Sequence, residues 1–288
     1  MKQANLELHV AVLLFGVTGL FGKLITASPL IIVFGRTASA AAIILLGLKI
    51  CKVGLAASSK KSRFFMLLSG LVLMIHWVIF FYAIQLSTVA IGVIGFSTFP
   101  VFVTFLEPIL FKQKLRNVDI ASGVLVVVGL LLVVPGLSLS NSSTIGLLWA
   151  VFSGALYAVL ALMNRRLVET NSFMLIAFYQ HSTAALCLLP FMFVGGESLD
   201  LRTILLLVIL GVVCTALPQS LFIKSLKFVK AQLASVVIGL ESVYGIFFAA
   251  LLLGEIPSLR TVAGAIVVLG AVILAMKAQS TPEHEIES

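Results

Sequence analysis

Apolar residues in this chain occur in long runs of roughly 18 to 23, and these runs restrict what it can fold into. A helix of that length, with a rise of about 1.5 Å per residue, crosses the roughly 30 Å of hydrocarbon in a bilayer. Of the 288 residues, 61% are apolar and only 10% are charged, whereas a soluble domain usually carries about a quarter charged residues. The runs therefore predict an integral membrane protein.

The apolar runs define ten predicted transmembrane helices joined by short connections. The spans are placed at 8–26, 30–48, 64–84, 89–111, 118–135, 144–164, 173–194, 202–223, 231–253 and 259–276. The connections leave little room for a soluble domain, so we expect an all-α membrane protein. Residues 279–288 are predicted to form a polar, disordered cytoplasmic tail. A cleaved signal peptide is the alternative for the first run, which at about 18 residues is long enough to be kept as a helix.

Basic residues alternate between the two sides of the predicted bundle in a strongly biased way. With the N-terminus inside, the inner set is Lys2, Lys49, Lys52, Lys60, Lys61, Arg63, Lys112, Lys114, Arg116, Arg165, Arg166, Lys224, Lys227, Lys230 and Lys277. The outer side holds Arg202 and Arg260 in loops, with Lys23 and Arg36 inside helices near that face. Cytoplasmic loops carry the excess of Lys and Arg, so we expect a multi-pass protein of the cytoplasmic (inner) membrane with both termini inside.

Several other classes of protein lack support in the sequence. The net charge of +8 comes from scattered loop residues without base-stacking aromatics, so nucleic acid is not an expected partner. Cys51, Cys187 and Cys214 form no C-x-x-C pair and are expected to be structural. Hydrolase, zinc-protease and ATP-binding motifs are absent, so we expect no enzyme, no cofactor and no metal. Any uphill transport would then draw on a gradient.

The two halves of the chain repeat each other at an offset of about 141–144 residues. The matching segments are Phe15-Gly16 with Lys23 and Tyr157-Ala158 with Arg165; Thr88 to Ala90 and Lys230 to Gln232; and Gly123 to Gly129 and Gly264 to Gly270. We expect a first five-helix repeat at 1–137 and a second at 138–278. Because five is odd, the second copy would be inverted in the membrane, an arrangement typical of alternating-access transporters.

The motifs together resemble EamA-type members of the drug/metabolite transporter superfamily. They are F-G-x6-K from Phe15 to Lys23, Gly35-Arg36, Pro100-Val101, and Gly254-Glu255 followed by Gly264 and Gly270. The resemblance implies ten helices, cytoplasmic termini and a central cavity lined mainly by spans 1, 3, 4, 6, 8 and 9. It also implies a family dominated by exporters of amino acids and other metabolites. Lys112-Gln113-Lys114 and Ser242 depart from the family pattern, which argues against a symmetric hinge.

Two charged residues fall deep inside predicted spans. Glu241 lies about ten residues into the ninth span, where an unpaired charge costs several kcal/mol, so it could bind and release a proton. A permanently protonated structural carboxyl is the alternative. Arg36 lies about six residues into the second span and could grip a carboxylate with parallel hydrogen bonds. An ion pair, or a side chain reaching the outer headgroups, is the alternative for Arg36.

The resemblance further implies that His76, Trp77 and Tyr157 lie on the cavity wall. Histidine titrates near neutral pH, and an indole can cover the apolar face of a ligand. Core packing is the alternative for each of the three. His181 and Gln180 are expected to hydrogen-bond between helices.

Three further predictions concern charges and helix bending. Glu107 is expected to pair with Lys112 or Lys114 at a helix end, and Lys23 to reach toward the outer headgroups. Pro100 removes a backbone hydrogen bond from span four and predicts a hinge, which Gly95 and Gly239 would ease. Close helix packing is expected at Gly16, Gly19 and Gly22.

The sequence therefore favours a secondary transporter that exports small metabolites such as amino acids by alternating access. A membrane scaffold or receptor, or a passive channel, is the alternative. The expected partners are a small-molecule substrate, the lipid bilayer and, as a coupling ion, the proton, with the protein a monomer or weak homo-oligomer. Substrate identity, direction of transport, coupling ion and oligomeric state stay open.

Overall fold

The computed structural model describes residues 2–111, 117–133, 138, 140–193, 199–229, 234 and 237–280, and every regular element among them is helical. The first half contains α1 (Lys2–Leu24), α2 (Pro29–Ile50), α3 (Lys60–Leu86), α4 (Val89–Phe96), α5 (Phe99–Phe111) and α6 (Asn117–Val133). The second contains α7 (Ser142–Leu167), α8 (Phe173–Leu188), η1 (Leu189–Phe193), α9 (Leu201–Gly211), η2 (Val212–Ala216), α10 (Leu217–Ser225), α12 (Glu241–Leu253) and α13 (Leu259–Ser280).

Seven helical stretches within the described residues are long and apolar enough to cross a membrane by length and composition. They are Leu6–Leu24, Pro29–Ile50, Lys60–Leu86, Val89–Leu110, Ser142–Leu167, Phe173–Phe193 and Leu201–Ser225. Three shorter apolar stretches follow the same pattern at Ile120–Val133, Val237–Leu253 and Leu259–Leu274. Each predicted span thus has an apolar helical stretch at its position in the chain.

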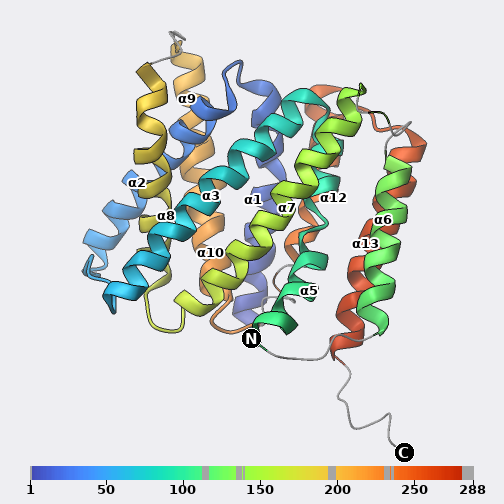
Figure 1. Ribbon diagram of the computed structural model, residues 1–288. Helices are drawn as coiled ribbons and strands as arrows, with labels where there is room; N and C mark the ends of the chain where they lie inside the picture. The colour runs from blue at the N-terminus through green and yellow to red at the C-terminus, as the bar shows by residue number, and fades with distance from the viewer. Residues whose placement is uncertain are drawn as a thin grey trace, which may run out of the picture.

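The helices form one bundle in which segments from the two halves interleave (Figure 1). At one edge α6 packs along α13, and toward the opposite edge α2 packs against α8 and α9. Between these edges α1 contacts α10 and α12, while α7 contacts α3 and α4. The centre of the bundle is therefore enclosed by helices from both halves.

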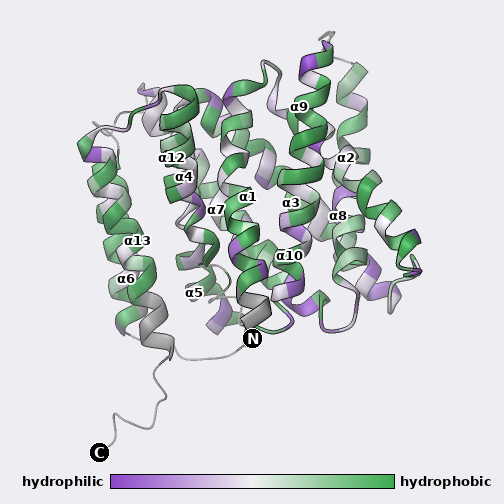
Figure 2. Ribbon diagram, turned by 180° about the vertical axis from the view of Figure 1, so that it is seen from behind, coloured by the Kyte–Doolittle hydropathy of each residue, from purple (hydrophilic) through white to green (hydrophobic). Residues whose placement is uncertain are grey.

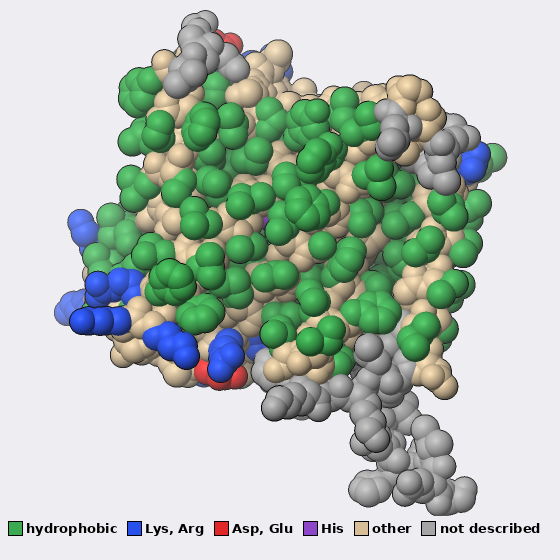
Figure 3. Space-filling model, in the orientation of Figure 1, with side chains coloured by type: hydrophobic (Ala, Val, Ile, Leu, Met, Phe, Trp, Pro, Cys, Tyr) green, Lys and Arg blue, Asp and Glu red, His purple; other side chains and the backbone are tan. Residues whose placement is uncertain are grey.

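The outside of the bundle is apolar, as a protein solvated by lipid requires. On α6, for example, the side chains of Ile120, Val124 and Val127 are each more than half exposed. Hydrophobic residues run along most of the helices, and hydrophilic ones gather near the helix ends (Figure 2). Apolar side chains cover the middle of the face in Figure 3, while Lys and Arg gather mainly toward the end where α1 begins.

Short polar residues in the connections explain where several helices begin. Ser59 accepts a hydrogen bond from the Ser62 amide at the start of α3, and Thr88 accepts one from the Ile91 amide at the start of α4. At the start of α9 the Asp200 carboxylate accepts from Thr203, and this hydrogen bond lowers the pKa of Asp200. These caps satisfy amides that no helical carbonyl can reach.

Two of the predicted spans are interrupted rather than continuous. In span four, α4 ends at Phe96 and α5 begins at Phe99, just before Pro100. Pro100 was expected to bend one helix; instead it lies in the first turn of a new one, where a missing N–H costs least. In span eight a π-helical turn, η2, separates α9 from α10.

Some sequence predictions concern residues outside the described part of the chain. These are the positions of Lys112, Lys114, Arg116 and Lys230 and the polar tail beyond Ser280. The predicted pairing of Glu107 with Lys112 or Lys114 is therefore not described. Glu107 itself is buried, with 7% of its surface exposed.

Candidate functional site

A small cavity at the centre of the bundle brings together the charged and aromatic residues singled out in the sequence. Its lining consists of Phe15, Thr18, Arg36, His76, Trp77, Phe80, Phe96, Tyr157 and Glu241. All five predicted binding or coupling residues, from four different helices, thus line one cavity. The cavity volume is about 20 Å³, room for about one water molecule and far too little for a metabolite. The bundle is therefore in a closed conformation.

Arg36 is fully buried on α2, so it does not reach the outer headgroups. Its Nε donates a 2.9 Å hydrogen bond to the Thr215 hydroxyl, and its guanidinium carbon lies 3.8 Å from the centre of the Trp77 ring. Both terminal nitrogens are buried and have no hydrogen-bond partner among the described residues. A buried cation with unused donors is costly unless an anion or polar group joins it.

The π-helical turn helps to position Arg36. Thr215 donates from its hydroxyl to the Leu210 carbonyl five residues earlier, at 2.7 Å, and thereby offers its oxygen to Arg36. The helices approach closely here, since a Cβ on Gly211 would lie 2.6 Å from the Arg36 carbonyl oxygen. A glycine at this position lets η2 meet α2.

His76 joins α3 to α7. Its Nδ1 lies 2.7 Å from the Ser153 hydroxyl and 3.0 Å from the Ser153 carbonyl oxygen. The Ser153 hydroxyl also donates to the His76 carbonyl at 3.1 Å. His76 therefore has a structural tether at one ring nitrogen, while its side chain still lines the cavity.

Aromatic rings form most of the remaining wall. The Tyr157 ring centre lies 4.9 Å from that of His76 and 5.2 Å from that of Phe96. Tyr157 also stacks on Phe222, with 5.8 Å between the ring centres. Such rings offer a large apolar surface next to the charged groups.

Glu241 supplies the carboxyl group of the cavity lining. It lies in the first turn of α12 and is 5% exposed. A carboxylate in a first turn is favoured by the positive end of the helix dipole. Glu241 and Arg36 line the same cavity, but no ion pair joins them in the described part of the chain.

The interruption of span four meets span nine beside this cavity. The Ser97 hydroxyl lies 3.4 Å from the Gly239 carbonyl oxygen, and a Cβ on Gly239 would lie 3.7 Å from Cγ of Pro100. Two hinge candidates, Pro100 and Gly239, are therefore neighbours. Gly95 packs tightly on α7, since a Cβ there would lie 2.6 Å from the Ala150 Cβ. Its hinge role stays a prediction.

The structure decides several other predictions. Gln180 does bond between helices, because its amide nitrogen donates to Ser69 at 2.9 Å and to Asn164 at 2.5 Å. For His181 the same prediction is wrong: neither ring nitrogen has a partner among the described residues, and the ring stacks on Trp77 at 5.6 Å.

The predicted close packing along α1 is confirmed. Added Cβ atoms would crowd Tyr244 from Gly16, Val89 from Gly19 and Ile84 from Gly22. Lys23 does not simply reach the headgroups, because its ammonium group donates to the Ser87 carbonyl.

Sequence reasoning missed Thr215 and Gln219. Thr215 lies in η2, and Gln219 lies four residues later in α10. Gln219 is fully buried, and both polar atoms of its amide lack partners among the described residues. The signal was present, since a hydroxyl and an amide four residues apart interrupt an apolar run. It was passed over because neither side chain carries a charge.

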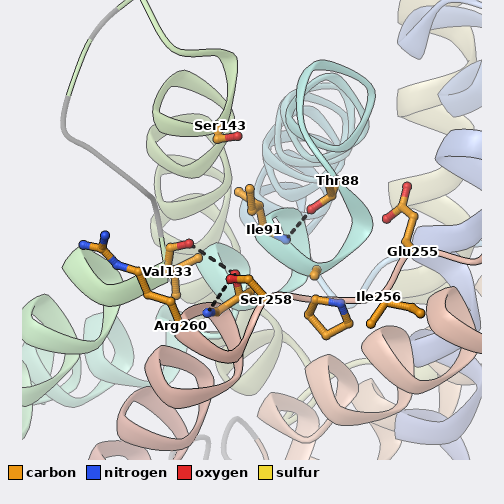
Figure 4. A pocket seen from close by; sticks show the side chains of 11 residues that line it. Thr88, Ile91, Val133, Ser143, Glu255, Ile256, Ser258 and Arg260 are labelled. Atoms are coloured by element: carbon orange, nitrogen blue, oxygen red, sulfur yellow. Dashed lines mark hydrogen bonds between the residues drawn. The ribbon is translucent and has the colours of Figure 1, made fainter.

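Two other hollows lie at the end of the bundle opposite the start of α1. The one in Figure 4, about 230 Å³, is lined by residues that include Thr88, Ser143, Glu255, Ser258 and Arg260. The Glu255 carboxylate already has a partner there, since its Oε2 accepts a 2.9 Å hydrogen bond from the Val89 amide.

The third hollow, about 640 Å³, is a wide opening beside Lys23 and Gln85. Neither hollow contains the predicted site residues. No cluster of His, Cys, Asp or Glu suited to a metal occurs in the described ranges.

Comparisons with known proteins agree with this fold. The EamA-like transporter family profile matches two successive segments, residues 4–134 and 144–277. The chain is 24% identical to the uncharacterized transporter YxxF of Bacillus subtilis, over 76% of this chain and 71% of the relative. It is 27% identical to an uncharacterized transporter of Archaeoglobus fulgidus, over 68% and 70% respectively. A crystal structure described only as that of a protein superimposes over the full length of both chains with a TM-score of 0.73 at 17% identity, which shows the fold alone.

Proposed function

Because the chain belongs to the EamA-like transporter family, we propose that it is a secondary active transporter whose central cavity binds a small metabolite. The substrate carries a carboxylate or similar anionic group beside an apolar part, as amino acids and related compounds do. Transport runs outward by alternating access, with the proton as coupling ion.

The observation that carries this proposal is the state of Arg36. Its two terminal nitrogens are buried at the cavity wall without partners among the described residues, next to the face of Trp77. A guanidinium can hold a carboxylate through two parallel hydrogen bonds, which would satisfy these donors. The neighbouring rings suit the apolar part of the substrate, and Glu241 suits an ammonium group or a proton.

We further propose ten transmembrane helices arranged as two inverted halves, 1–137 and 138–278. Exchanging the halves turns α1 into α7, α3 into α10, and α5 into α12. The contact of α1 with α10 then becomes that of α7 with α3, and the contact of α1 with α12 becomes that of α7 with α5; all four contacts occur. Such reciprocity supports a two-fold axis in the membrane plane passing near the cavity.

The proposed orientation has both termini in the cytoplasm and the protein in the cytoplasmic membrane. Lys and Arg gather mainly toward the end of the bundle where α1 begins, as the positive-inside rule favours (Figure 3). The hollow in Figure 4 would then face outward.

Comparison of metabolites released by cells tests the proposal. We expect cells producing the protein to accumulate an anionic or zwitterionic metabolite outside, relative to cells producing Arg36→Gln at equal membrane abundance. Arg202→Gln, which removes an exposed charge, is the control and should behave as the parent. Identical metabolite profiles for the parent and Arg36→Gln would contradict the assignment.

A further inference from the structure

Two basic side chains make the same contact at opposite ends of the bundle. Lys23, in the last turn of α1, donates from Nζ to the Ser87 carbonyl at 2.8 Å. Arg165, in the last turn of α7, donates from Nη1 to the Val229 carbonyl at 2.8 Å. The α1 end lies opposite the start of the chain, whereas α7 ends near it (Figure 1).

The two contacts are related by the internal repeat. Both partners of the second contact, Arg165 and Val229, lie 142 residues after their counterparts Lys23 and Ser87. In each half the cation ends the first helix, and the carbonyl follows the helix of the third predicted span. Under the proposed two-fold axis the contacts are therefore one contact made twice, once on each side of the membrane.

The acceptors suit this role because they are carbonyls beyond the end of a helix. Ser87 lies between α3 and α4, and Val229 follows the turn after α10, so neither carbonyl belongs to a regular helical segment. Lys23 also donates to the Gln85 carbonyl at 3.4 Å, in the last turn of α3, where the helix dipole favours a cation. Each contact ties the end of one helix to the residues that follow another helix.

Both contacts are formed while the central cavity is too small for a metabolite. We propose that Lys23 and Arg165 are paired gate residues, and that breaking the Lys23 contact opens the outer end of the cavity while breaking the Arg165 contact opens the inner end. The proposal rests on the two inverted halves of the proposed function. It assigns a role in transport to two cations that do not line the cavity.

Each end has a further link. At the inner end Lys224 on α10 makes an ion pair with Glu7 on α1, with 2.6 Å between Nζ and Oε1. At the outer end the Gln85 side chain on α3 donates to the Ala27 carbonyl, just after α1, at 2.8 Å. Loss of either basic residue alone should therefore open its end only in part.

Thiol labelling from each side of the membrane tests the gates without requiring transport. The reporter is Thr18→Cys, at the cavity wall, in a chain with Cys51→Ser, Cys187→Ser and Cys214→Ala. A membrane-impermeant methanethiosulfonate is applied to right-side-out or inside-out vesicles. We expect Lys23→Met to raise the outer labelling rate about tenfold, the effect of losing one charge-assisted hydrogen bond, and Arg165→Met to raise the inner rate.

Exposed cations at the same ends serve as matched controls. Arg202→Met at the outer end and Arg166→Met beside Arg165 should leave both labelling rates unchanged. Lys23→Arg and Arg165→Lys keep a donor and should label like the parent. Lys23→Ala and Arg165→Ala repeat the test if a methionine variant folds poorly.

The outcome separates this proposal from the proposed function. Opposite sidedness in the two variants supports the gates even if no substrate flux is found, and swapped sidedness would reverse only the orientation. The proposal is overturned if both variants raise labelling from the same side, or if neither changes it in properly folded protein.

Discussion

Burial of Arg36 carries a large electrostatic cost, because its charge has one hydrogen bond to a described residue and two aromatic rings as compensation. A side chain that only stabilised the bundle would have all its donors used, as the amide nitrogen of Gln180 has with Ser69 and Asn164. A substitution at Arg36 should therefore reduce transport without lowering stability, whereas a substitution at Gln180 should lower stability.

Arg36→Gln should reduce substrate flux at least about tenfold while leaving the melting temperature equal or higher, because an uncompensated buried charge is removed. Arg36→Lys should also lose flux, since an ammonium lacks the planar fork. Gln180→Leu is the opposite control and should lower the melting temperature. Flux per folded molecule and thermal melts in detergent give both readouts. A melting temperature that falls in step with flux in Arg36→Gln would assign the arginine a structural role.

Glu241→Gln should leave the shape of the cavity intact but remove the one carboxyl group among the described residues of its lining. If the carboxyl carries the coupling proton, the variant's flux should stop responding to a pH gradient while the parent's flux responds. Glu255→Gln, at the outer end, should respond as the parent does. Unchanged flux and pH response in both Glu241→Gln and His76→Ala would show that the site is assigned wrongly.

At the scale of the helices, one feature of span four could be predicted from the sequence and another could not. Pro100 marked the place where the helix is interrupted, because the loss of a backbone donor can be read directly from the sequence. The contact of Ser97 with Gly239 could not be predicted, since it depends on how α4 and α12 approach each other. Local chemistry was predictable, whereas contacts between distant helices were not.

Pro100→Ala should slow transport severalfold at saturating substrate with little change in half-saturation, because a continuous helix resists the opening motion while the cavity wall is untouched. Pro108→Ala, inside α5 and away from the interruption, is the matched control and should have little effect. Initial rates over a range of substrate concentrations distinguish the two parameters. An unchanged maximal rate in Pro100→Ala would contradict a hinge role for the interruption in span four.

The packing of α6 on α13 offers a test of stability that is independent of transport. A Cβ on Gly264 would lie 2.6 Å from the Gly129 carbonyl oxygen, whereas one on Gly270 would meet nothing within 4 Å. Gly264→Ala should therefore cost about 1–3 kcal/mol of stability through overpacking. Gly270→Ala on the same exposed helix should be neutral or stabilising by up to about 1 kcal/mol. Equal melting temperatures for the two variants would contradict the described helix contact.

For the whole molecule, the membrane class followed from the length of the apolar runs, and the repeat followed from matched motifs such as Lys23 and Arg165. The family resemblance placed His76 on the cavity wall, but the convergence of Arg36 and Glu241 on the same cavity required the fold, because α2 and α12 are far apart in the chain. The closed state of the cavity also had no signal in the sequence. Pocket volume depends on the packing of whole side chains, which a hydrophobic pattern does not specify.

The central claim is that the enclosed cavity carries a substrate from one side of the membrane to the other. Counterflow in liposomes tests it most directly, using the metabolite that distinguishes cells producing the parent from those producing Arg36→Gln. We predict saturable uptake that is accelerated by the same metabolite inside the vesicles, and its loss in Arg36→Gln. Flux that neither saturates nor responds to internal substrate would indicate a channel, and no flux above protein-free liposomes would indicate a scaffold or receptor; either result would contradict the account.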